Sequence, residues 1–83
     1  MDSERTVWKG QKAEKKEQKS RLKLAIEDRR NSIRTILNPH TPILEIDQNL
    51  LSQLSFELSS NLIEYKRLEK EIAAINKSLG IVE

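Results

Sequence analysis

The fold is decided by a short stretch in the middle of the chain, Leu37-Asn38-Pro39-His40-Thr41-Pro42. Pro39 disfavours a helical conformation at the residue before it, so a helix that reaches this stretch should end near Leu37. Thr41 followed by Pro42 suits the start of a second helix, and Asp47 is a rival N-cap five residues later. The stretch therefore predicts two helices joined by a loop over residues 38–42. It leaves the start of the second helix open between residues 42 and 47.

The second helix is predicted over about residues 43–79 by apolar residues that recur in steps of three and four. These positions, which we call the seam, are Leu51, Leu54, Leu58, Asn61, Tyr65, Leu68, Ile72, Ile75 and Leu79, with Val82 one step further. A repeat sustained over more than four heptads is typical of coiled-coil packing. Gly80 is the predicted helix stop and would leave Val82 outside the helix.

The first helix is predicted over about residues 22–37. Its apolar positions are Leu22, Ile26, Ile33 and Ile36, with Arg29 at the seam position between the two central isoleucines. Upstream of Leu22 the seam positions become Lys19, Lys15 and Lys12, and end at Trp8. Residues 1–21 are therefore predicted to be a basic polar arm or an extension of the helix, ahead of a helical hairpin over residues 22–83.

Composition supports an all-α fold and limits the function. The chain has 83 residues, of which 34% are charged and 4% aromatic, so it is one small domain without the β-branched and aromatic content of a sheet. It has no cysteine and a single histidine, His40, so we expect no metal site and no cofactor. There is no membrane span and no apolar signal-peptide segment, so we expect a cytoplasmic protein that does not bind membranes.

A short loop makes the two helices antiparallel, and matching the seams gives a register. Ile36 is then level with Leu51, and Leu22 with Tyr65, so this half closes on apolar residues. In the other half, Leu68, Ile72 and Ile75 would face Lys19, Lys15 and Lys12. Lysine stems are poor substitutes for leucine, so we expect this half of the seam to lack an apolar partner in its own chain.

That expectation implies association, with a second copy in a helical bundle, as a homodimer, or with another helical protein. The expected partner-binding residues are Leu68, Ile72, Ile75 and Leu79, with Phe56 and Ile63 as a second patch and Trp8 as an anchor. Trp8 is also level with Leu79 and can instead cap the open end of the hairpin. Arg29 and Asn61, polar at seam positions, are expected to give pairing specificity.

The predicted function is a non-catalytic protein–protein interaction module, such as an adaptor, a chaperone-like protein or a dimerisation protein. The alternative is association with nucleic acid. Residues 1–23 carry eight Lys/Arg against four acids, and a face of possible phosphate contacts is formed by Lys12, Lys15, Lys16, Lys19 and Lys23. The same lysines can instead pair with Glu64 and Glu71. No nucleophile and base lie at catalytic spacing, so we do not expect an enzyme.

Ile26-Glu27 with Arg30, the segment Leu54-Ser55-Phe56-Glu57-Leu58-Ser59, and Tyr65 somewhat resemble the short helical-hairpin phosphatases that act on phosphorylated response regulators in spore formers. That family's motif reads Ser-Gln-Glu-Leu-Asp. Here Phe56 replaces the glutamine and Ser59 replaces the aspartate. The resemblance covers about half the chain and implies the same hairpin fold. Because the aspartate is missing, it does not predict phosphatase activity.

Overall fold

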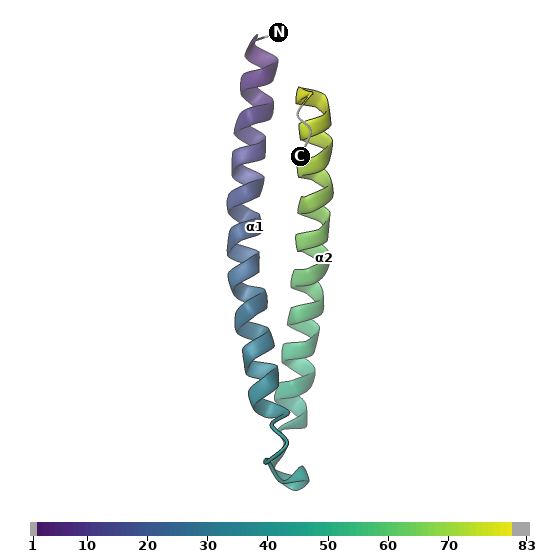
Figure 1. Cartoon of the computed structure of the whole chain (residues 1–83). Helices are drawn as coiled ribbons and strands as arrows, with labels where there is room; N and C mark the ends of the chain where they lie inside the picture. The colour runs from purple at the N-terminus through teal and green to yellow at the C-terminus, as the bar shows by residue number, and fades with distance from the viewer. Residues whose placement is uncertain (1, 81–83) are drawn as a thin grey trace.

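The computed structural model describes residues 2–80, with side chains from residue 4 onward. The described chain is an all-helical hairpin of two long antiparallel helices, α1 (Asp2–Ile36) and α2 (Gln48–Leu79), with a 3-10 turn, η1 (Ile43–Glu45), between them (Figure 1). The molecule is a rod of 63 × 20 × 14 Å. The predicted hairpin is therefore confirmed; Val82 and the ends of the predicted ranges, residues 1 and 81–83, lie outside the described residues.

Helix α1 is much longer than the predicted span of residues 22–37, because residues 2–21 extend the helix toward the N-terminus. Its first half is rich in Lys, Glu and Gln, which have high helix propensity. Glu17 and Arg21, four residues apart, form an ion pair along the helix. Of the two predictions for this segment, an arm or a helix extension, the structure shows the extension.

The proline-containing loop ends α1 at Ile36, next to the predicted position, and starts a compact turn. The N–H of His40 donates to Oδ1 of Asn38 at 2.9 Å, and the N–H of Thr41 donates to the Asn38 carbonyl at 3.0 Å. These two hydrogen bonds stabilise the turn at the point where Pro39 prevents the helix from continuing. Pro42 then leads into η1, in which the Glu45 N–H donates to the Pro42 carbonyl.

Asp47, not Thr41, caps α2. Its Oδ1 accepts the N–H of Leu50 at 3.0 Å, while its own backbone is extended with φ −78° and ψ 92°. A helix cannot run through an extended residue, so of the two starts left open by the sequence, residues 42 and 47, the structure has the second, and α2 begins at Gln48, later than the predicted span of about 43–79. The predicted stop is confirmed, because Gly80 ends α2 in the left-handed conformation with φ 72°.

The register predicted from the seams agrees with the contacts between the helices to within one residue. Arg29 pairs with Glu57, next to the predicted Leu58, and Lys15 pairs with Glu71, next to the predicted Ile72. The ammonium of Lys19 lies 5.1 Å from the centre of the Tyr65 ring. The two helices therefore stay side by side from the loop to the far end, as Figure 1 shows.

Candidate interaction surfaces

The second half of the α2 seam is buried, and the expectation that it lacks a partner in its own chain is wrong. Leu68 is 1% exposed, and the other predicted partner-binding residues of the seam, Ile72, Ile75 and Leu79, are also buried. The half of the hairpin nearer the loop, where the seam positions of both helices are apolar, is less deeply buried. There Ile33 and Leu58 are only half-buried. The seam of α2 is therefore an internal contact with α1, and it does not form a free surface.

Lysine stems cover this half of the seam, and their ammonium groups end on carboxylates of α2. Lys15 Nζ donates to Glu71 Oε2 at 2.9 Å, and Lys19 Nζ lies 2.9 Å from Glu69 Oε2. Both lysines are half-buried, so their methylene groups pack on apolar neighbours while the charge reaches the rim. This is how the basic first half of α1 replaces the missing apolar residues.

Hydrogen bonds at some of these ion pairs shift the pKa of a member of the pair. The hydrogen bond from Lys15 holds the pKa of Glu71 below its usual value, and the bond from Arg67 does the same for the pKa of Glu64. The pKa of Glu57 is lowered by hydrogen bonds from Gln53 and Arg29. On the other side of the rod, the bond to Glu69 raises the pKa of Lys19.

Arg29 and Asn61, predicted to give pairing specificity, both lie half-buried between the helices. Arg29 Nε donates to Glu57 Oε2 at 2.6 Å, and its Nη1 donates to Asp28. The guanidinium therefore joins α1 to α2 at one level and favours this register over others. A polar residue that sequence reasoning missed is Asn76, which is buried beside Ile75 and has no distinctive spacing.

Trp8 lies at the open end of the hairpin, on the same level as the last turns of α2. It lines one shallow pocket together with Gln11, Lys15, Glu71, Ala74, Ile75 and Ser78. The side chain remains 38% exposed. This placement fits the second of the two predictions, a cap on the open end, and leaves only part of the indole for a partner.

Exposed apolar side chains remain at several places once the seam is buried, among them Leu24 on α1, and two sites each bring together two of the most exposed. The first is the outer patch, which we define as Phe56 and Ile63, exposed by 75% and 67% on the side of α2 that faces away from α1. The second is η1, where Ile43 is 85% exposed and Leu44 99%. Sequence reasoning missed η1 because it placed both residues in the first turn of α2.

The five predicted phosphate-contacting lysines differ in exposure. Lys12, Lys15 and Lys19 are half-buried beside the seam, whereas Lys16 and Lys23 are exposed on the flank of α1. Within residues 4–80, no group of three or more His, Cys, Asp or Glu side chains is placed to hold a metal ion, and His40 is exposed in the loop. Neither helix, over its described residues, is long and apolar enough to cross a membrane.

Comparison with known proteins finds no matching family model, no matching curated protein and no matching solved structure.

Proposed function

We propose that the chain is a non-catalytic protein–protein interaction module that pairs with a second copy of itself through the outer patch. The exposure of Phe56 and Ile63 carries this proposal. The two side chains are seven residues apart and therefore lie on one line of α2, two turns from each other. Full burial of side chains of this size is worth about 1.5–3 kcal/mol each.

The outer patch is self-complementary when the two copies of α2 run antiparallel. If a two-fold axis passes between residues 59 and 60, Phe56 of one copy lies level with Ile63 of the other, and the reverse. Lys70 then lies level with Asn49 of the other copy. A parallel arrangement would instead set Lys70 against Lys70, which like-charge repulsion disfavours.

The residues around the outer patch allow two helices to approach closely. Ser52, Ser59 and Ser60 are small and exposed, and they surround Phe56 and Ile63 on α2. The acidic residues of α2 lie toward α1 instead, where Glu57, Glu69 and Glu71 form ion pairs with it. Pairing at this face would set the four helices side by side in one layer, with the two copies of α2 in the middle, without disturbing the contacts within each hairpin.

Sedimentation equilibrium tests the proposal. We expect a weak dimer with a dissociation constant in the range of tens of micromolar, since four apolar side chains only modestly exceed the entropy cost of association. The double substitution Phe56→Ser with Ile63→Ser should make the protein monomeric while its helicity stays unchanged. Leu24→Ser, which alters a similarly exposed apolar residue on α1, is the matched control and should leave the dimer intact.

A wild-type protein that remains monomeric up to several hundred micromolar would rule the proposal out. So would a dimer that survives the double substitution, because its interface would then lie elsewhere. The substitutions Leu68→Ser and Ile75→Ser are unsuitable for this test, since both side chains are buried within the hairpin and their loss would unfold it.

A further inference from the structure

The lysines of α1 fall into two sets, and the division follows the seam. Lys12, Lys15 and Lys19 occupy seam positions, and Lys15 and Lys19 pair with carboxylates of α2. A second set consists of basic residues that each come directly after a seam position in the sequence. A helix turns by about 100° per residue, so these residues lie toward one flank of the rod. We define this set, Lys9, Lys16, Lys23 and Arg30, as the basic row.

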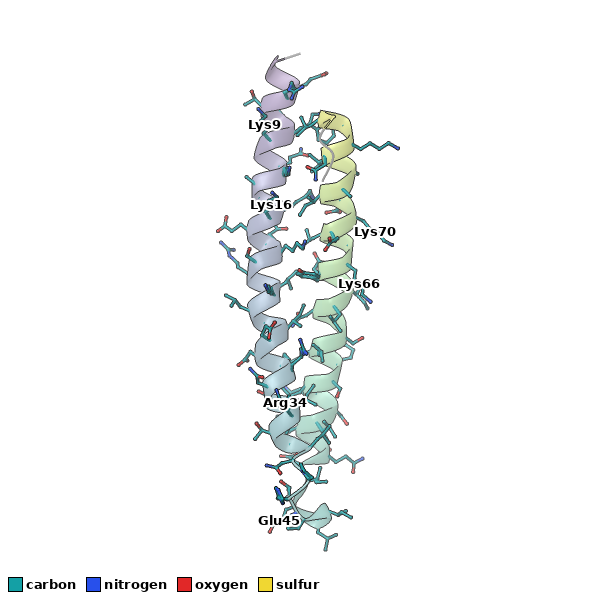
Figure 2. The ribbon with its side chains drawn as sticks, viewed as in Figure 1. Lys9, Lys16, Arg34, Glu45, Lys66 and Lys70 are labelled. Carbon is teal, nitrogen blue, oxygen red and sulfur yellow. The ribbon has the colours of Figure 1, made fainter. Side chains whose placement is uncertain are left out.

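The basic row is regular and exposed. Its members are seven residues apart, so they recur every two turns on one line and span about 32 Å at 1.5 Å per residue. All four side chains are exposed, and none forms an ion pair within the part of the chain that the structure describes. Figure 2 shows Lys9 and Lys16 following one another along α1. Their charges are therefore available to a ligand.

The flank that carries the basic row has an excess of positive charge. Arg34 on α1 and Lys66 on α2 add to it by their helical positions, and both are exposed. This flank carries two acids, Glu69 and Glu27. The charge of Glu69 is balanced by its ion pair with Lys19, so only Glu27 offsets the basic residues of the flank. The opposite flank carries Glu57, Glu64 and Glu71, which are paired with Arg29, Arg67 and Lys15. The rod is therefore basic on one side and nearly neutral on the other.

From these observations we infer that the basic row binds the phosphate backbone of duplex nucleic acid. Its length of about 32 Å is close to one turn of a duplex, about 34–36 Å. No aromatic residue belongs to the row, so the contacts are to phosphates and the binding is independent of base sequence. The neighbouring positions Ala13 and Ser20 offer no large apolar side chain that would insert into a bilayer. This binding does not depend on the dimer proposed above.

Fluorescence anisotropy with a labelled random-sequence DNA duplex of about 20 base pairs tests the inference. Four phosphate contacts predict a slope of log K against log salt of about −3.6, so affinity should fall on the order of 100-fold between 50 and 200 mM salt. The variant Lys9→Gln, Lys16→Gln, Lys23→Gln should flatten the slope by about 2.7 and abolish binding at moderate salt. Its circular dichroism should match that of the wild type, since all three residues are exposed.

The matched control removes the same charge elsewhere, through Arg21→Gln, Arg67→Gln and Lys77→Gln. It should retain the duplex affinity within about threefold. Equal loss in the two variants would overturn the inference, because net charge and not the basic row would then be responsible. Absence of binding at low salt would also overturn it. So would equally tight binding of polyglutamate or of phosphatidylserine vesicles, which would identify an acidic protein or a membrane as the partner.

Discussion

The Lys15 ammonium lies 2.9 Å from Oε2 of Glu71, although 56 residues separate them in the chain. The pair joins the charged first half of α1 to the apolar second half of α2. Each lysine stem covers part of the seam, and each ammonium group is neutralised at its edge. The first half of α1 therefore has a structural role, which its composition alone does not suggest.

Deleting residues 1–18 tests this role. The truncated chain should expose Ile72, Ile75 and Leu79, and should either self-associate or lose helicity near its C-terminal end. Its melting temperature should fall by at least about 10 °C, since several kcal/mol of apolar burial are lost. Sedimentation velocity and circular dichroism measure both effects. A truncated chain that is monomeric and as stable as the whole chain would show that α1 does not protect the seam.

Leu68 should be among the most sensitive positions in the molecule. Leu68→Ala should reduce the free energy of unfolding by about 2–5 kcal/mol, because it leaves a cavity at the most buried point of the seam. Leu24→Ala removes the same atoms from a side chain that is 73% exposed and should cost less than about 0.5 kcal/mol. Chemical denaturation measures both variants. Similar costs for the two would contradict the burial described here.

Charge reversal tests the register at Arg29 and Glu57. Arg29→Glu and Glu57→Arg should each lower the melting temperature, because each sets two like charges against one another across the hairpin. The double reversal should recover most of the loss, since it restores an ion pair with the opposite polarity. Thermal denaturation of the three variants at low salt is the measurement. If the double variant is no more stable than the singles, the two side chains do not interact.

Stability should depend on pH at both ends of the scale. The pKa values of Glu57, Glu64 and Glu71 lie below the ordinary 4.5, so these groups stabilise the fold above that pH and lose the effect as pH falls through their lowered values. The pKa of Lys19 is raised above 10.5, so its contribution is complete below that pH and is lost as pH rises through the raised value.

The melting temperature should therefore be flat between about pH 5 and pH 10 and fall on either side. Glu71→Gln should weaken the acid dependence, and Glu69→Gln the alkaline one. An acid limb that Glu71→Gln leaves unchanged would assign the effect to other carboxylates.

The start of α2 depends on one side chain. Asp47→Ala should cost about 1 kcal/mol, because the N–H of Leu50 loses its acceptor. Asp47→Asn keeps an oxygen in the same place and should cost much less. Thr41→Ala should have little effect on α2, since Thr41 lies before η1 and does not cap the helix. An equal cost for Thr41→Ala and Asp47→Ala would contradict this assignment.

Much of the fold can be predicted from local chemistry. Pro39 and Gly80 act on their own backbone, so the end of α1 and the end of α2 follow from single residues. The register also follows, because the seam positions recur at fixed steps. The start of α2 could not be settled in this way, since Thr41 and Asp47 are both suitable caps and the choice depends on how η1 folds.

The exposed surfaces were harder to predict, because they depend on how far a long side chain extends over its neighbours. A lysine at a seam position counts as polar in a periodic pattern, yet Lys15 and Lys19 are half-buried and the seam residues opposite them, Leu68 and Ile72, are buried. The prediction of an open seam failed for this reason. Phe56 and Ile63 could be identified from the sequence, because their position opposite the seam does not depend on what any lysine covers.

The seam is apolar on both helices near the loop but lysine-lined on α1 near Trp8. Dissolved salt screens the Lys15 and Lys19 ion pairs near Trp8, and it screens the Arg29–Glu57 pair nearer the loop as well. It does not weaken the burial of Leu68 and Ile75 within the seam. Rising salt should therefore release the charged ends of these side chains while the hairpin stays closed along its length.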